Sequence, residues 1–250
     1  MVIYDAHAHI GTEEEVKIRK TYRIKTFLCA VNPLEAAAVE ELCRDSSELI
    51  PTYGLHPWYA GQFSVAEMLP YLKKGRLLGE IGMDSEWCEV PLMRQKETFL
   101  EQLKLAKSWN MPVILHTKGQ EKEILRCIDT FTPPVLVHGY SDESYLEGYI
   151  EKDCFFSVGP DVRQNTAVRK VVNDVRLNRL LVESDGMDAV RWAHAGSRTF
   201  KVPPADTELP YILRDTIEFI AKAKGAHPET VAGQLAENFL YLADYCKELL

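Results

Sequence analysis

Imidazole and carboxylate side chains recur at one kind of position in this sequence, the end of a short apolar run. Five of the seven histidines and two acids close such runs: His7, His9, His56, Glu80, His116, His138 and Asp185. Run ends make up roughly a tenth of such a chain, so chance would place about one histidine there. Neutral imidazole and carboxylate are ligands of Zn²⁺ and related divalent ions. The distribution therefore predicts a metal site.

The first run ends in His-Ala-His, a spacing that suits one ion. Residues i and i+2 of a strand point to the same face, so His7 and His9 can reach a common ion. Six residues are candidate ligands: His7, His9, Glu80, His116, His138 and Asp185. Six exceeds the three protein ligands typical of one catalytic zinc, which favours two ions and a bridging carboxylate. Two ions about 3.5–4 Å apart can serve a hydrolysis, because they bind the attacking and leaving oxygens and lower the pKa of water.

Eight short apolar runs carry these residues, and they lack the alternation of a half-exposed strand. The runs span 2–7, 26–32, 50–56, 76–82, 112–116, 134–138, 155–159 and 179–185. Such runs are typical of parallel strands buried on both faces. Segments with helical spacing lie between them: 34–47, 64–74, 91–109, 119–130, 142–151 and 165–177.

This alternation predicts an α/β fold, a single (β/α)8 TIM-type barrel domain over residues 1–250. The tail, 208–250, adds two C-terminal helices, divided near Gly225 and Pro228. In a barrel all eight strands end at one face, where active sites of this fold are built. We interpret the irregular stretch 186–207, after the eighth strand, as a long active-site loop or cap.

Composition limits the classes of partner and location. The chain has 29 basic and 37 acidic residues and a net charge of −8, which argues against a general nucleic-acid-coating surface. Its six cysteines form no CxxC pair, so we interpret them as packing residues in a reduced, intracellular protein. We see neither a signal peptide nor an apolar run long enough for a membrane helix. These features predict a cytoplasmic protein with no membrane partner.

Three acidic features near the candidate ligands have their own interpretations. Glu80 lies between glycines, which permit close backbone approach. Asp5, two residues before His7, either orients an imidazole or pairs with a lysine elsewhere. We expect the acids Glu13, Glu14 and Glu15 in a short loop after the first strand, where they would repel a phosphate.

Several motifs together resemble the TatD family of metal-dependent hydrolases, within the amidohydrolase-like barrels. The motifs are DAHAH (5–9), GLHP (54–57), GEIGMD (79–84), RQKETF (94–99), PVILH (112–116), VHGYS (137–141), FFSVG (155–159) and ESD (183–185). The tail segment 229–242 also resembles the last helix of that family. Together these segments cover nearly the whole chain in the family's order.

The resemblance implies a hydrolase of ester bonds that uses two divalent ions (zinc, magnesium or manganese), with deoxyribonuclease activity. One ion would have three ligands: His7, His9 and Asp185. The other would have two: His116 and His138. Glu80 would bridge the ions, and Asp185 is also a candidate general base. His56 matches a family histidine that contacts substrate or lies just behind the ligands.

Three segments depart from the family's usual pattern: SDGMDA (184–189), PPADTELP (203–210) and HGYS (138–141). The candidate ligands are retained, whereas the substrate-facing loops differ. We therefore predict a phosphodiesterase that acts on DNA or a small phosphoester. One alternative keeps the metals but acts on a small amide, ester or lactone, and another is a barrel that binds without catalysis. The sequence leaves the substrate, the native metal and the oligomeric state open.

Overall fold

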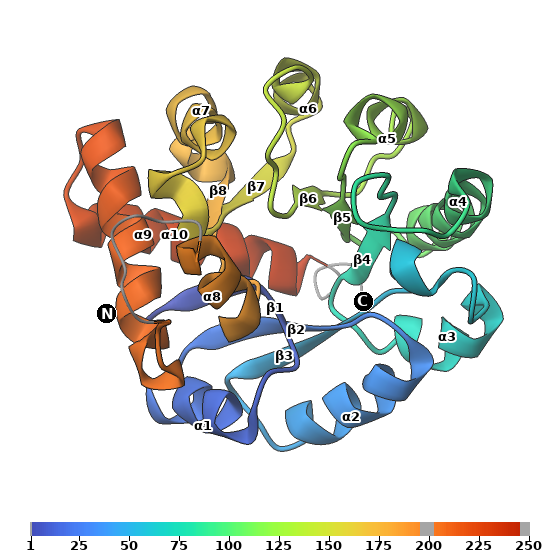
Figure 1. Cartoon of the computed structure of the whole chain (residues 1–250), viewed down its shortest axis with the longest axis horizontal. Helices are drawn as coiled ribbons and strands as arrows, with labels where there is room; N and C mark the ends of the chain where they lie inside the picture. Colours follow the sequence, from blue (N-terminus) through green and yellow to red (C-terminus); the bar gives the residue numbers. More distant parts are fainter. Residues whose placement is uncertain (1, 196–202, 246–250) are drawn as a thin grey trace.

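A computed structural model describes residues 2–195 and 203–245 of the chain. Eight strands form its centre: β1 (Tyr4–His9), β2 (Lys25–Ala30), β3 (Leu49–Tyr53), β4 (Leu78–Gly82), β5 (Val113–His116), β6 (Val135–Val137), β7 (Phe155–Val158) and β8 (Leu180–Val182). Neighbouring strands pair in parallel in chain order, from β1 to β8. Just beyond β8, the Asp185 amide donates to the His7 carbonyl at 3.0 Å, which brings the two ends of the sheet together. The predicted (β/α)8 barrel is confirmed (Figure 1).

Helices surround this barrel in the described residues (Figure 1). The α-helices are α1 (Glu13–Thr21), α2 (Pro33–Cys43), α3 (Val65–Leu72), α4 (Leu92–Ser108), α5 (Glu121–Cys127), α6 (Leu146–Glu151), α7 (Thr166–Asp174), α8 (Met187–Ala195), α9 (Leu209–Lys224) and α10 (Pro228–Asp244). Short 3-10 helices are η1 (Pro57–Tyr59), η2 (Pro160–Arg163), η3 (Leu177–Arg179) and η4 (Asp206–Glu208). The helices cover the outer face of the sheet, which explains why strands such as β4 are buried at every residue.

Helix α1 replaces the loop that the sequence predicted around the three acids. Thr12 caps the helix, because its hydroxyl accepts a hydrogen bond from the Glu15 amide at 3.1 Å. The three acids lie in the first turn, where their negative charge is stabilised by the positive end of the helix dipole. Glu15 is buried and pairs with Arg19 at 2.8 Å. The loop prediction was wrong, and Glu15 is neutralised inside the protein instead of facing a substrate.

The stretch 186–207 is not the continuous irregular loop that the sequence predicted. Helix α8 begins at Met187, with four residues separating it from the end of β8, and buries Met187 and Val190. Residues 196–202 lie outside the described residues, and η4 follows Pro203 and Pro204. The loop interpretation therefore fails for the first half of the stretch.

The predicted C-terminal helices are present, and α10 covers one end of the barrel. The Phe239 ring stacks on Phe27 with centroids 3.9 Å apart and contacts Tyr4, the first residue of β1. The Asn238 amide donates to the carbonyls of Leu177 and Leu180, at 2.9 and 2.7 Å. Because Tyr4 and Leu180 begin their strands, α10 covers the amino ends and leaves the carboxyl ends for a site. None of the helices in the described residues is long and apolar enough to cross a membrane.

Candidate metal centre

Four donor atoms converge at the carboxyl mouth of the barrel, and we name them the open set: His7 Nε2, His9 Nε2, Glu80 Oε2 and Asp185 Oδ1. His7 Nε2 lies 3.4 Å from His9 Nε2, 3.4 Å from Glu80 Oε2 and 3.5 Å from Asp185 Oδ1. His9 Nε2 lies 3.4 Å from each of the two carboxylate oxygens. A tetrahedral ion with bonds of about 2.1 Å separates its ligands by about 3.4 Å. The two histidine nitrogens therefore lie at tetrahedral-ligand spacing from each other and from each carboxylate oxygen, and with Asp185 they form a group that could hold a metal ion.

Two oxygens of the open set fit a cation for a second reason. Glu80 Oε2 and Asp185 Oδ1 are buried and have no hydrogen-bond partner in the part of the chain that the structure describes. A buried carboxylate oxygen without a partner is costly, and a bound cation would satisfy it. Asp185 also has φ of 58°, the left-handed region that non-glycine residues rarely adopt, so its placement is enforced by its surroundings.

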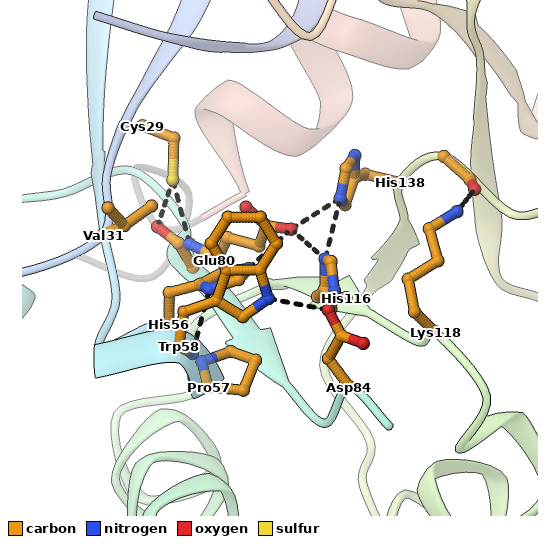
Figure 2. Close-up of polar contacts among 12 residues, drawn as sticks. Cys29, Val31, His56, Pro57, Trp58, Glu80, Asp84, His116, Lys118 and His138 are labelled. Carbon is orange, nitrogen blue, oxygen red and sulfur yellow. Dashed lines mark hydrogen bonds and ion pairs between the residues drawn. The ribbon is translucent and has the colours of Figure 1, made fainter. Parts of the chain in front are cut away.

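The other oxygen of the same carboxylate defines the buried set: Glu80 Oε1, His116 Nδ1, His138 Nε2 and His56 Nε2. Glu80 Oε1 lies 2.5 Å from His138 Nε2, 2.7 Å from His116 Nδ1 and 3.6 Å from His56 Nε2. The two shorter distances are hydrogen bonds, and Figure 2 shows them converging on the Glu80 carboxylate. His56, expected to contact substrate or lie behind the ligands, directly faces Glu80, in a group with His116 that could hold a metal ion.

Protonation differs between the two sets. Burial acts to raise the pKa of Glu80, but the surrounding imidazoles outweigh it and hold that pKa well below the usual range. Burial acts to lower the pKa of His138 and His116, but Glu80 outweighs it and raises both. Burial lowers the pKa of His9 to about 4, and does the same for His56. Two histidines of the buried set, His116 and His138, therefore hold protons that face Glu80, whereas His56 and His9 are neutral, as an imidazole must be to bind an ion.

The six predicted ligands do meet at one mouth, although their strand positions differ from the expectation. Glu80 was expected at the end of its strand, but it lies in the middle of β4 and is 1% exposed. Asp185 lies beyond the end of β8, and His138 directly follows β6. The register aligns His9 with Cys29 and Gly82 with His116, which gathers the strand ends at one level.

Two carboxylates that the sequence analysis did not select hold the outer nitrogens of the buried set. Asp84 Oδ2 lies 3.1 Å from His116 Nε2, and Glu183 Oε2 lies 3.5 Å from His138 Nδ1. Glu183 also accepts the Ser157 hydroxyl at 2.5 Å and the Gly139 amide at 2.9 Å. Carboxylates in this position fix the orientation of an imidazole ligand. Both residues belong to motifs quoted above: Asp84 ends GEIGMD, and Glu183 begins ESD.

Cys29 corrects the interpretation of all cysteines as packing residues away from the cluster. Its Sγ accepts the Glu80 amide at 3.0 Å and donates to the Gly79 carbonyl at 3.1 Å (Figure 2). With His7 and Glu80 it forms a further group that could hold a metal ion. Burial raises the pKa of this thiol well above its ordinary value, so it stays protonated and supports Glu80 through the backbone.

Asp5 neither orients an imidazole nor pairs with a lysine in the structure. Its carboxylate lies 2.6 Å from the buried guanidinium of Arg19, and it accepts the Ser184 amide at 2.9 Å and hydroxyl at 2.6 Å. Ser184 directly precedes Asp185. Both expected partners were wrong, and Asp5 instead anchors the backbone that carries a candidate ligand.

The fold and the mouth cluster together define a class, a barrel whose strand ends gather histidines and carboxylates that could hold metal ions. The chain belongs to one family within this class, the TatD related DNases, whose model matches residues 4–243. The resemblance carried by the sequence motifs is thereby confirmed.

Individual similar proteins agree with this membership. An uncharacterized metal-dependent hydrolase, YcfH of Escherichia coli, is 28% identical over 171 residues, which are 66% of this chain and 61% of YcfH. The 3'-5' ssDNA/RNA exonuclease TatD of Pantoea ananatis is 25% identical over 231 residues, 84% of each chain. The crystal structure of YjjV, a TatD homologue from Escherichia coli, matches with a TM-score of 0.80 at 24% identity. It covers 96% of this chain and 97% of its own, and shows the same fold.

Proposed function

We propose that this protein is a phosphodiesterase that cleaves DNA and depends on two divalent ions, of zinc, magnesium or manganese. The open set would hold one ion and the buried set the other, with Glu80 bridging them through its two oxygens. The spacing of the open set carries the proposal, because His7, His9 and Asp185 form a group whose donor separations of 3.4–3.5 Å match ligands of one tetrahedral ion, and Glu80 Oε2 lies 3.4 Å from both histidine nitrogens. Bound ions would supply Lewis acidity toward the phosphoryl group and activate water at neutral pH.

The protein's own groups would orient the substrate and move the proton. Asp185 is 32% exposed at its side chain, so a water or a phosphodiester at the mouth can reach it. Its carboxylate would accept a proton from the attacking water. Glu80 is almost fully buried, so its role would be to bridge the ions and not to exchange protons with solvent.

The relatives favour a nucleic-acid ester over a small carbonyl compound. The Pantoea protein is named as an exonuclease of single-stranded DNA and RNA, and the matching family is named for DNases. The acid triplet after the first strand was expected to repel a phosphate, which was a reason against a nucleic-acid substrate. Glu15 of that triplet is buried against Arg19, which removes part of that reason.

A metal and substrate screen tests the proposal. Purified protein should bind divalent ions and, with Mg²⁺, Mn²⁺ or Zn²⁺, cleave short single-stranded DNA and bis(p-nitrophenyl) phosphate. His116→Ala should lose this activity while remaining folded. A folded protein that binds no ion, or that hydrolyses only amides, esters or lactones when metal-loaded, would refute the proposal.

A further inference from the structure

An aromatic hollow opens beside the buried set, and no step proposed above uses it. It has a volume of about 410 Å³ and six lining residues: Trp58, Gln62, Trp87, Cys88, Glu89 and Val90. We name it the tryptophan pocket. Its volume lies within the range of small-molecule binding sites, about 300–1,000 Å³.

The walls of the pocket are tied directly to the candidate metal centre. The Trp58 indole donates to Asp84 Oδ2 at 2.7 Å, and the same oxygen faces His116 (Figure 2). The backbone amide of Trp87 donates to the other oxygen of Asp84, at 2.9 Å. One carboxylate therefore fixes both tryptophans and a candidate ligand, so the pocket and the metal centre keep a defined separation.

The loop that forms one wall is also held at its far end. The buried amide of Gln95 accepts the Asp84 amide at 2.8 Å and donates to the Val90 carbonyl at 2.7 Å. The Cys88 thiol donates to the Pro57 carbonyl at 3.6 Å, which joins this loop to η1. A ligand entering a pocket that is already shaped loses less entropy on binding.

Large aromatic surfaces face solvent here. Trp87 is 53% exposed and Trp192 of α8 is 68% exposed. Their rings pack edge to face, with the ring centroids 6.1 Å apart. The Lys118 ammonium lies 5.5 Å from the Trp87 ring centroid. Exposed indoles beside a cation are the elements with which proteins stack the bases of single-stranded nucleic acid.

The charge inside the pocket decides which part of a nucleotide fits it. Glu89 lines the pocket, and a carboxylate there repels a phosphate but accepts hydrogen bonds from the amino group of a base such as cytosine. The phosphate then belongs at the ions, which carry positive charge.

We propose that the tryptophan pocket binds the unstacked base of the nucleotide whose phosphodiester lies at the metal centre. This inference rests on the proposed phosphodiesterase function. A base can lie against an indole only after it has left the duplex stack, so paired DNA would be a poorer substrate.

A matched pair of substrates tests the pocket. One is deoxycytidine 5′-(p-nitrophenyl phosphate), and the other is its abasic counterpart, in which a tetrahydrofuran ring replaces the nucleoside. Base stacking is worth about 1–3 kcal/mol, so kcat/KM should favour the first by about 5-fold to 150-fold. Trp87→Ala should remove most of this preference by slowing only the base-bearing substrate, and Trp87→Phe should retain much of it. Tyr211→Ala removes an exposed aromatic side chain that does not line the pocket, and it should change neither rate.

A binding measurement on the metal-loaded protein, with a nucleoside monophosphate that contains no diester bond, gives a second readout that needs no turnover. Deoxycytidine monophosphate should quench the indole fluorescence saturably, deoxyribose 5-phosphate should not, and Trp87→Ala should weaken binding at least about 5-fold. Equal turnover of both substrates, or quenching unchanged in Trp87→Ala, would overturn the pocket and leave the phosphodiesterase proposal standing. Failure to hydrolyse either substrate with any ion would overturn the phosphodiesterase proposal itself.

Discussion

The open set and the buried set use the two oxygens of one carboxylate, yet they are built differently. The open set has metal-like separations of 3.4–3.5 Å and two carboxylate oxygens without hydrogen-bond partners among the described residues. The buried set is drawn together by hydrogen bonds of 2.5 and 2.7 Å to Glu80 Oε1. The difference indicates that an ion can enter the open set with little change, whereas the buried set must first lose protons and widen.

The largest effect is expected from Glu80, because both sets depend on it. Glu80→Gln removes the charge that faces five imidazoles, so neither ion should be retained. Loss of metal catalysis worth several kcal/mol lowers kcat/KM by about 10³-fold or more. Elemental analysis and steady-state kinetics measure the two effects, with the exposed Glu151→Gln as the control. Retention of one full ion by Glu80→Gln would show that the sets are independent.

The ion pair between Arg19 and Asp5, which anchors the backbone next to Asp185, can be removed without changing any candidate ligand. Arg19→Met leaves the buried Asp5 without its guanidinium, and such an unpaired charge costs about 3–5 kcal/mol of unfolding free energy. Urea unfolding monitored by circular dichroism measures this loss. The triple variant Arg19→Met with Asp5→Leu and Glu15→Gln should recover much of it, because neither carboxylate that pairs with Arg19 is then left unpaired. If Arg19→Met were as stable as wild type, the network would not be the anchor of the Asp185 segment.

The support of the buried set predicts a smaller effect. Glu183→Gln weakens the contact that orients His138, and losses of this kind cost about 10-fold to 100-fold in metal affinity or activity. Titration calorimetry should show weaker binding of the second ion and unchanged binding of the first. Asp84→Asn should also weaken binding of the second ion, because Asp84 contacts His116. Equal weakening of both ions would contradict the division into two sets.

The smallest effect is a difference in pH dependence. In the metal-free protein the pKa values of His116 and His138 are raised, so an ion entering the buried set displaces protons. Its affinity should therefore rise with pH, by about tenfold per unit for each proton released. His9, with its pKa lowered to about 4, is already neutral, so the first ion should respond less. Calorimetric titrations at a series of pH values compare the two slopes, and equal slopes would contradict the account.

Much of the fold and the convergence of the six candidate ligands could be predicted from the sequence. Unalternated apolar runs place the strands, and a barrel brings their carboxyl ends together whatever the details of packing. Helix α1 was also predictable, because Thr12 followed by three acids is a helix start signal that was interpreted as a loop. Asp84 lies within the GEIGMD motif, but its role depends on the contact with His116, which comes from another strand.

Other features depend on pairing between distant residues and leave no pattern in the sequence. Asp5 contacts Arg19 and Ser184, and Cys29 contacts the backbone of Glu80 across the barrel. Such contacts follow from how neighbouring strands and helices pack, and spacing along one segment does not reveal them. The tryptophan pocket is of the same kind, since Trp58 and Trp87 come from separate segments of the chain. The cytoplasmic location stays a prediction.

Anomalous diffraction from crystals soaked in Mn²⁺ or Zn²⁺ tests the central claim most directly. The account predicts two peaks about 3.5–4 Å apart, one contacting His7, His9 and Asp185 and the other contacting His116 and His138. Glu80 should lie between the peaks, with one oxygen toward each. A single peak at full metal saturation, or two peaks without Glu80 between them, would contradict the account.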